Sequence, residues 1–530
     1  MSSRNGSAGL YLPTSLLRKL LSCILRYSVF CGLALGAIAS HAAQCTQPLQ
    51  LAAAANDSWS GWGNGLHNTR QATAGIDSGD LASLELRWAF GFPDAGSAIG
   101  NPVVHGDVLY AGSESGTVHA LDANSGCTHW TFKAATGVRT APALAQIGGR
   151  WLLFFGDRSA QVYALDAYSG VQVWLTKVEA HPAAILTGAP QYFQLADDIT
   201  ADRLLVPVSS SEEGIAAVPT YPCCSFRGSV VSLDAATGAV LWQQHTIQNP
   251  VQATGAQTQG PSGAAIWSAP TIDLANKRFY VTTGDAYSAP ADIASDAVLG
   301  MDLASGKILW INPGTTDDIW TVACLGANAP DDCGPDQDYG SPGLLVSSAD
   351  HRFLVTGQKS GYVRAFNLDG GSQRWRTLLV ENPNEFGGKI VWGGASDAEQ
   401  VYFGLGSGGI AALRISDGEL QWFAPLSPST ERVDHPGQDG PLTVSDDLVI
   451  SGGWDGMLRI LSSKDGRELW SYDTVRSYES TNAVATSGGS MGAVGPVVAG
   501  RRLFVSTGYV GVKNGLSGNA LLMFAPSGAP

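Results

Sequence analysis

The sequence predicts an all-β protein, an eight-bladed β-propeller whose ring is closed by strands from both termini. Two observations predict it: a tryptophan-ended repeat that returns along the chain, and an incomplete last copy whose missing strand is found near the N-terminus. The repeat is clearest at residues 116–130, Gly-Thr-Val-His-Ala-Leu-Asp-Ala-Asn-Ser-Gly-Cys-Thr-His-Trp. Further copies end at Trp174, Trp242, Trp310, Trp375, Trp422 and Trp470. Each copy combines an alternating strand, a turn with glycine and a tryptophan in the next strand, the pattern of a propeller blade.

The two ends of the chain supply the eighth blade. Residues 518–528 begin another copy, but the sequence stops before the outer strand and its tryptophan. Residues 81–88, which end at Trp88, offer the missing strand. A ring closed in this way leaves no open sheet edge, which gives the division of the blade between the termini a physical reason.

The first 42 residues predict a secretory signal. They contain four basic residues and no acidic one, then an apolar run at 27–38 and the small-residue end Ala39-Ser-His-Ala42. The run is too short to span a bilayer, and no later stretch reaches about 18 uninterrupted apolar residues. We therefore expect a signal peptide at 1–42, a lead-in segment at 43–80 and a propeller at 81–530, exported to the periplasm without a membrane span.

The charge of the chain narrows its partners. The formal net charge is −15, and removal of a purely basic signal makes the mature chain more acidic still. Such a charge disfavours nucleic acid and anionic membranes as partners.

Six cysteines follow the signal, and their number suits an oxidising compartment. Cys324 and Cys333 bracket a short loop and are expected to bridge, which leaves Cys45 and Cys127 as the remaining pair. Cys223 and Cys224 are adjacent, and adjacent cysteines rarely bridge for structural reasons alone. No Cys-x-x-Cys-His is present, so the sequence predicts no covalent haem and no zinc site.

The repeats resemble the tryptophan-docking motifs of the quinoprotein alcohol dehydrogenases, from about Trp59 to Phe524. Within that superfamily the motifs are similar to those of the polyvinyl alcohol dehydrogenases without a fused cytochrome domain. They are Glu212-Glu213, Cys223-Cys224-Ser-Phe-Arg-Gly228, residues 260–267 and Gly488-Gly-Ser-Met-Gly492. The resemblance implies pyrroloquinoline quinone and calcium as cofactors.

The resemblance also implies where these cofactors bind. Trp267 matches the tryptophan on which the flat quinone stacks, and Asp285 stands where the methanol dehydrogenases have a calcium-binding Asn. An aspartate keeps an oxygen ligand that a hard cation accepts. The second calcium ligand is expected at Glu213, with Glu212 close behind. The alternatives are ordinary blade packing for Trp267, a turn cap for Asp285 and solvated surface acids for the pair.

Further residues are implied to contact the quinone. Cys223 and Cys224 match a vicinal disulfide that covers the quinone face opposite the tryptophan, although the pair occurs one blade later than in methanol dehydrogenase. Lys359 matches a lysine that holds the quinone oxygens. Arg227 is expected to pair with a cofactor carboxylate, because a guanidinium forms a bidentate fork with it. The alternative for Lys359 and Arg227 is an exposed surface cation.

The catalytic base is the point at which the resemblance fails. The family has an aspartate directly after the tryptophan of an Asp-x-Trp-Asp motif, but here Trp320 is followed by Thr321. Thr321 cannot act as a base near neutral pH. Asp318 or Asp317, just before the tryptophan, are the predicted catalytic bases; Asp285 and a site without turnover are the alternatives.

The sequence therefore predicts a periplasmic quinoprotein dehydrogenase that oxidises an alcohol, of which the secondary hydroxyls of polyvinyl alcohol are implied by resemblance. Its electrons pass to a separate cytochrome c or another periplasmic acceptor. Nicotinamide and flavin enzymes are disfavoured because no Gly-x-Gly-x-x-Gly motif opens a helix after a strand. The alternative from another class is a non-catalytic scaffold or binding protein resembling the outer-membrane assembly propellers.

Overall fold

The computed structural model describes residues 43–530 except 53–56, 73–74, 196–201, 249–259, 327–328, 350, 382–388, 428–432, 434–436, 439, 512–514 and 530. The predicted signal peptide at 1–42 lies outside the described residues. The regular secondary structure of the described chain is nearly all strand, with one short α-helix, α1 (Glu212–Ile215), and two short 3₁₀ helices, η1 (Leu81–Ser83) and η2 (Val322–Leu325). Within these ranges no helix has the length and apolar character needed to cross a membrane.

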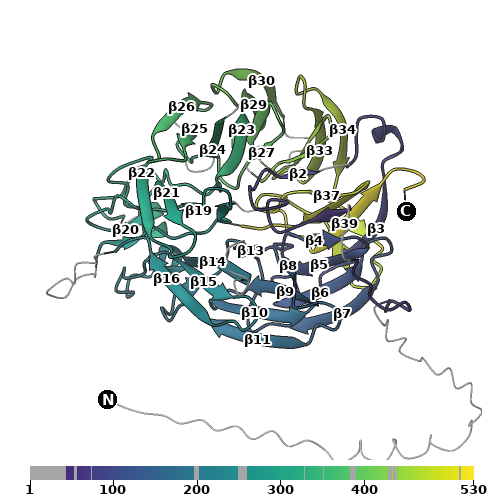
Figure 1. Ribbon diagram of the computed structural model, residues 1–530. Coiled ribbons are helices and arrows are strands. Elements are labelled where there is room, and N and C mark those ends of the chain that lie inside the picture. Colours follow the sequence, from purple (N-terminus) through teal and green to yellow (C-terminus); the bar gives the residue numbers. More distant parts are fainter. Residues whose placement is uncertain are drawn as a thin grey trace, which may run out of the picture. The chain divides into compact units, whose positions relative to one another are not determined.

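Eight antiparallel sheets of four main strands form the blades, as predicted (Figure 1). Blade 1 is β4 (Val103–His105), β5 (Val108–Gly112), β6 (Thr117–Asp122) and β7 (Thr128–Lys133). Blade 2 is β8 (Ala143–Ile147), β9 (Arg150–Gly156), β10 (Gln161–Asp166) and β11 (Gln172–Lys177). Blade 3 is β13 (Gln191–Gln194), β14 (Asp202–Ser210), β15 (Ser229–Asp234) and β16 (Val240–His245), with β12 (Ala184–Ile185) also on β14. Blade 4 is β18 (Thr271–Asp273), β19 (Arg278–Thr282), β21 (Ala297–Asp302) and β22 (Ile308–Pro313).

The remaining four blades follow the same plan. Blade 5 is β23 (Leu344–Ser348), β24 (His351–Gly357), β25 (Tyr362–Asn367) and β26 (Gln373–Leu378). Blade 6 is β27 (Ala395–Ser396), β28 (Gln400–Gly404), β29 (Gly409–Arg414) and β30 (Leu420–Pro425). Blade 7 is β31 (Thr443–Ser445), β32 (Leu448–Gly452), β33 (Met457–Ser462) and β34 (Glu468–Asp473). Blade 8 is β37 (Val497–Ala499), β38 (Arg502–Thr507), β39 (Ala520–Ala525) and the outer strand β3 (Glu85–Gly91). Two small ladders lie between blades, β17 (Ser262–Gly263) with β20 (Ala286–Ser288), and β35 (Ser477–Tyr478) with β36 (Thr486–Ser487).

The predicted closure between the termini is confirmed. Strand β3, which carries Trp88, pairs antiparallel with the C-terminal strand β39. Trp88 and Phe504 contact each other within a core cluster that joins both ends of the chain. Because the outer strand of the last blade comes from the N-terminal side, the ring cannot open without breaking this core.

The repeated tryptophans pack against the turn of the following blade. Trp88 lies over Gly126, where an added Cβ would come within 2.9 Å of the indole, and its Nε1 donates to the carbonyl of Ala123. The same stacking joins Trp130 to Gly170, Trp174 to Gly238, Trp242 to Gly306, Trp310 to Gly371, Trp375 to Gly418 and Trp422 to Gly466. Trp470 instead packs on Tyr472 of its own strand β34 and on Phe524 of the closing blade. The glycine at this position in the repeat is therefore required by the approaching indole as well as by its positive φ.

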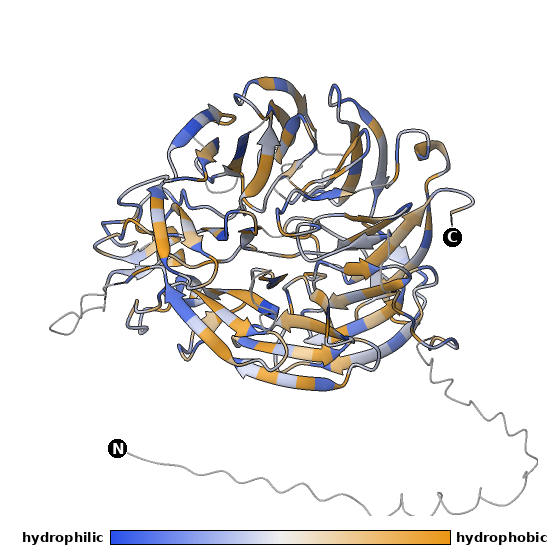
Figure 2. Cartoon of the chain, in the orientation of Figure 1, coloured by the Kyte–Doolittle hydropathy of each residue, from blue (hydrophilic) through white to orange (hydrophobic). Residues whose placement is uncertain are grey.

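The strands alternate in polarity, which is visible as orange and blue bands on the outer strands (Figure 2). Apolar side chains of one blade pack on those of the next and form clusters that are shared between blades. This arrangement buries both faces of each blade.

The lead-in segment has a structural role that the sequence did not predict. Its strand β1 (Ser58–Trp59) pairs with β4, and β2 (Gln71–Ala72) pairs in parallel with β31. Between them, the carbonyls of Leu66, His67, Thr69 and Arg70 accept backbone N–H groups at the inner strands of blades 4, 5, 6 and 7. The fully buried Arg70 donates to the carbonyls of Trp62, Leu442 and Pro496. The segment therefore ties the inner strands of several blades together.

Candidate active site

The predicted quinone platform, Trp267, lies just before β18 and is half-buried. Its indole Nε1 donates to Asp338 Oδ2 at 3.2 Å. The ammonium of Lys359, from the turn between β24 and β25, is 5.5 Å from the centre of the indole ring. Trp392 meets the ring edge-on at 5.0 Å between centroids. Loops of blades 4 and 5 thus bring a flat aromatic face, a carboxylate and a cation together, as the resemblance implied for Trp267 and Lys359.

Two buried lysines hold this carboxylate loop. Lys359 Nζ lies 2.6 Å from both Asp336 Oδ1 and Asp338 Oδ1, and Lys389 Nζ lies 2.6 Å from Asp336 Oδ2. Burial lowers the pKa of Lys359, but Asp336 and Asp338 outweigh it, so the pKa stands well above its usual value. Lys359 therefore stays charged. Its contacts differ from those of an exposed surface cation, which was the alternative interpretation of this residue from the sequence.

A cluster of carboxyl groups lies against the lysines. Carboxylate oxygens of Asp285, Asp336 and Asp338 lie within 4.8 Å of one another, and so do those of Asp285, Asp296 and Asp318. All five residues are buried. Burial, and then the charge of Asp338, raises the pKa of Asp285 well above its usual value. So many acids in one buried place are costly unless a cation or protons neutralise them.

Glu213 completes the cluster from α1. It is half-buried, and burial raises its pKa to about 7, against the opposing effect of Lys359. Asp338 and Asp336 are among the charges that act on it, so its carboxyl faces the same loop. Oxygen ligands of this kind suit a hard divalent cation, and Asp285 offers two oxygens that have no donor among the described residues. The residues present therefore fit the calcium that the family implies.

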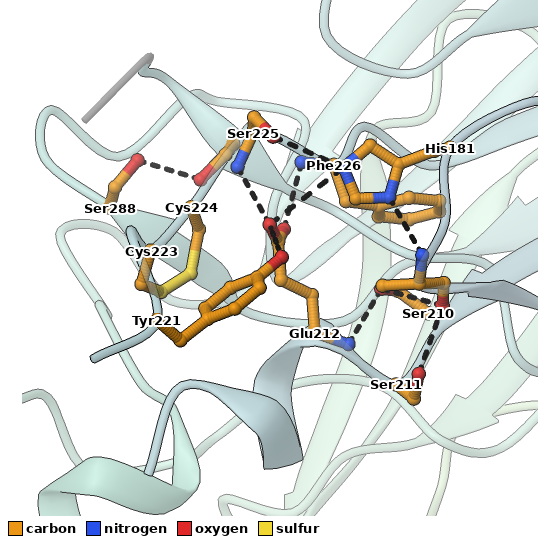
Figure 3. Close-up of polar contacts among 12 residues, drawn as sticks. His181, Ser210, Ser211, Glu212, Tyr221, Cys223, Cys224, Ser225, Phe226 and Ser288 are labelled. Carbon is orange, nitrogen blue, oxygen red and sulfur yellow. Dashed lines mark hydrogen bonds and ion pairs between the residues drawn. A yellow bond between two sulfur atoms is a disulfide. The ribbon is translucent and has the colours of Figure 1, made fainter. Parts of the chain in front are cut away.

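The neighbouring Glu212 faces the other way and is fully used. Its buried carboxylate accepts hydrogen bonds from the Tyr221 hydroxyl at 2.8 Å and from the backbone N–H groups of Ser225 and Phe226 at 3.0 and 2.8 Å (Figure 3). These contacts hold the loop that carries Cys223 and Cys224. Of the two acids that the sequence offered as a calcium ligand, the contacts of Glu212 favour a structural role.

Cys223 and Cys224 form a vicinal disulfide, as predicted (Figure 3). Cys224 is fully buried in a cluster that includes Phe226, Ala265 and Tyr287. Tyr287 lies close enough to Glu213 and Asp285 for their charges to raise its pKa further, although burial is the main cause. The disulfide is thus linked to the carboxylate cluster through Tyr287. The two other predicted bridges, Cys45–Cys127 and Cys324–Cys333, are also present.

Of the two predicted catalytic bases, only Asp318 belongs to the carboxyl cluster among the described residues. Asp318 is buried and accepts backbone N–H groups of Asp336 and Gln337 at 3.2 and 2.8 Å, so it supports the loop that presents Asp338. Burial raises its pKa. Asp317 is exposed. These contacts favour a positioning role for Asp318.

The sequence reasoning missed Asp296, Asp336, Asp338 and Lys389. Residues 321–337, which include η2 and the Cys324–Cys333 bridge, separate Trp320 from Asp338. Trp320 nevertheless lies 5.9 Å from Lys359, the same ammonium that contacts Asp338. Asp338 therefore lies near Trp320 in space, although a loop closed by a disulfide separates the two residues in the sequence. The signal in the sequence was the pair of acids in Asp336-Gln-Asp338-Tyr, which lies within the loop that follows Trp320.

Two arginines differ in their freedom to bind an anion. Arg227 donates to the carbonyl of Ile247 at 3.0 Å and has no contact with the carboxylate cluster among the described residues. Arg139, between β7 and β8, stacks on Trp392 at 4.6 Å and Tyr509 at 5.7 Å, and within the described part of the chain its guanidinium has no hydrogen bond or ion pair. Trp392 is also the neighbour of Trp267, so Arg139 is a free cation close to the platform.

Comparison with known proteins identifies the class. The model of the PQQ family of glucose, ethanol and alcohol dehydrogenase propellers matches residues 59–324, and that of the outer membrane protein assembly factor BamB matches residues 359–521. A solved europium-containing methanol dehydrogenase superposes with a TM-score of 0.67 at 17% identity, over 89% of this chain and 98% of that one. The fold and the family model together define a quinoprotein alcohol dehydrogenase, an oxidoreductase.

The relatives in sequence narrow the family further. A polyvinylalcohol dehydrogenase of Pseudomonas sp. is 36% identical over 89% of this chain and 77% of its own length. A polyvinylalcohol dehydrogenase of Sphingopyxis sp. strain 113P3 is 34% identical over 92% of this chain and 79% of its own length. The chain therefore belongs to the pyrroloquinoline quinone dependent alcohol dehydrogenase family, within which polyvinylalcohol dehydrogenases are its relatives.

Proposed function

We propose that the protein oxidises secondary alcohols, the hydroxyls of polyvinyl alcohol or a similar compound, to ketones in the periplasm, with pyrroloquinoline quinone and calcium. The observation that carries the proposal is the joint placement of Trp267, Asp338 and Lys359 beside carboxyl oxygens that have no hydrogen-bond donor in the described part of the chain. The names of the sequence relatives support the substrate class.

Different residues would bind different parts of the cofactors. Trp267 offers the flat face, Lys359 the cation for the quinone oxygens, and Arg139 a free guanidinium for a cofactor carboxylate. Glu213, Asp285 and the Asp336–Asp338 loop would hold the hard cation. A quinone held by these residues would supply the two-electron acceptor for oxidation of the alcohol carbon.

Asp338 is our candidate for the base that takes the alcohol proton. Its carboxylate is held in place by Trp267 Nε1 and Lys359, and burial raises its pKa above the usual range despite the lysine. A raised pKa makes the carboxylate a stronger base, while the fixed ammonium stabilises the ionised form that must accept the proton. Asp318, the base predicted from the sequence, would then position this loop.

The test is dye-linked oxidation by the purified mature chain, with quinone and calcium added. Polyvinyl alcohol and a short secondary alcohol are compared, with quinone-free and alcohol-free controls. We expect dye reduction only when quinone, calcium and alcohol are all present. Absence of quinone-dependent reduction, with no quinone retained after desalting, would favour the non-catalytic scaffold instead.

The electron acceptor and the location are parts of the same proposal. A separate cytochrome c is the expected acceptor because the sequence contains no haem-attachment motif. Cell fractionation and N-terminal sequencing of the native protein check the location, with a periplasmic chain that begins at Ala43 as the expected result. A cytoplasmic chain that retains residues 1–42 would contradict it.

A further inference from the structure

Asp285 and Asp296 form a buried carboxyl pair, of which the proposed quinone site uses only Asp285. Each side chain is only 1% exposed. Both oxygens of Asp285 and Oδ1 of Asp296 have no hydrogen-bond donor among the described residues. The backbone fixes the pair, because the N–H of Asp296 donates to the carbonyl of Gly284, next to Asp285. The two groups therefore cannot easily move apart.

A buried carboxylate without a donor costs several kcal/mol. The group within hydrogen-bonding reach of Asp296 is the other carboxyl, that of Asp285. Two carboxylates have no proton to share unless one is protonated, so either a proton or a cation must lie between them. The neighbouring charged residues determine whether a proton or a cation is favoured.

Asp318 supplies a third ligand to this pair. Its Oδ1 accepts the N–H of Asp336 and its Oδ2 the N–H of Gln337, but a carboxylate has about four acceptor sites, so it can still bind a cation. Oxygens of Asp285, Asp296 and Asp318 lie within 4.8 Å of one another. Ligands about 2.4 Å from a calcium ion are separated by up to about twice that distance, so the spacing suits a shared hard cation.

The charge of the cluster also favours a cation. Two buried lysines, Lys359 and Lys389, face the carboxyl groups of Glu213, Asp285, Asp296, Asp318, Asp336 and Asp338. With all of them ionised, one divalent cation would leave a net negative charge in a buried site. A second divalent cation would remove that excess.

We propose that Asp285, Asp296 and Asp318 bind a second hard divalent cation, with Asp285 bridging it to the cation of the quinone site. The inference rests on the proposed function because the two sites share Asp285. Asp296 has no role in the quinone site as proposed above, so it distinguishes the two.

The test counts the calcium ions bound by the metal-stripped, quinone-free full-length mature chain, by isothermal titration and by elemental analysis after desalting. We expect two calcium ions per wild-type chain and one for Asp296→Asn. Asp302→Asn, at the far end of β21, the strand that begins directly after Asp296, is the matched control and should keep both. Asp318→Asn serves if Asp296→Asn does not fold, and it too should lose one.

The outcomes separate this inference from the proposed function. One calcium ion in the wild type, unchanged in Asp296→Asn, would overturn the second site and leave the first, with a proton shared between Asp285 and Asp296. Two ions that both survive Asp296→Asn and Asp318→Asn would also overturn it. No bound calcium would count against both sites, whereas quinone retention would test the platform separately.

Discussion

Two fully buried acids, Glu212 and Asp285, differ in the hydrogen-bond donors that surround their carboxylates. Glu212 has three donors within 3.0 Å, and they hold the vicinal disulfide loop. Asp285 has no donor among the described residues and lies among other carboxyl groups and Lys359. Because an unsatisfied buried carboxylate is costly, the difference indicates that Glu212 serves the fold and that Asp285 serves a ligand.

Glu213 connects the two regions. It follows Glu212 in the same short helix, yet its carboxyl faces the lysines and acids around Asp338. Adjacent residues of a helix point about 100° apart, so one turn can support the disulfide loop and supply a metal ligand. The following predictions test whether this division of roles is correct.

The largest expected effect is on turnover in the Asp338→Asn variant. Removal of a general base should lower kcat by about 10²–10⁴-fold while quinone is retained. Dye-linked kinetics on quinone-loaded protein measure this. Asp318→Asn is the comparison variant and should lose less, since Asn can still accept a hydrogen bond from the loop. A larger loss in Asp318→Asn would return the role of the base to the sequence prediction.

The next effect is on stability in the Glu212→Ala variant. The change leaves the N–H groups of Ser225 and Phe226 and the Tyr221 hydroxyl without their acceptor, which should cost about 3 kcal/mol of unfolding free energy. Denaturant unfolding of the metal-free protein measures it. Glu213→Ala is the control, with an expected change below about 1 kcal/mol. Equal losses in the two variants would remove the distinction between the acids.

A smaller effect is expected on calcium affinity in Glu213→Gln. The loss of one charged ligand should weaken binding at least about tenfold, or about 1.4 kcal/mol. The pKa of Glu213 near 7 also gives a pH dependence. Below pH 7 a proton occupies the carboxyl and competes with calcium, so wild-type affinity should rise with pH and level off above about 7. Titrations from pH 5.5 to 8 should show less of this rise in the variant; identical profiles would exclude Glu213 as a ligand.

The smallest effect is expected for Arg139→Gln. Its guanidinium is half-buried and partly screened by solvent, so the loss of one charge-assisted contact should weaken quinone binding by about fivefold, or ~1 kcal/mol. Equilibrium dialysis with calcium present measures it, with Arg227→Gln as the control. A greater loss in Arg227→Gln would support the arginine chosen from the sequence.

The sequence was sufficient for the fold because the repeat is local. Each tryptophan and turn glycine lie within one copy, and closure by Trp88 follows from the incomplete last copy. The disulfide partners were also predictable from spacing and elimination. Trp267 and Lys359 could be proposed as site residues because they stand in recognisable motifs.

The rest of the site depends on three-dimensional contacts that spacing does not encode. Asp338 is separated from Trp320 by a loop of 17 residues, so a motif that expects them side by side misses it. Lys389 follows blade 5 in the sequence whereas Asp336 precedes it, yet the two side chains form an ion pair. Asp296 lies beside Asp285 because its N–H donates to the carbonyl of Gly284. The lead-in segment likewise forms hydrogen bonds with several blades, and no local sequence pattern predicted these bonds.

The most direct test of the account is quinone retention by the metal-free protein after desalting, with and without calcium. We expect about one quinone per wild-type chain when calcium is present, little without it, and little in Asp285→Ala under either condition. Retention that is independent of calcium and unchanged in Asp285→Ala would contradict the central claim that the carboxyl groups beside Trp267, which have no donor among the described residues, form the cofactor site.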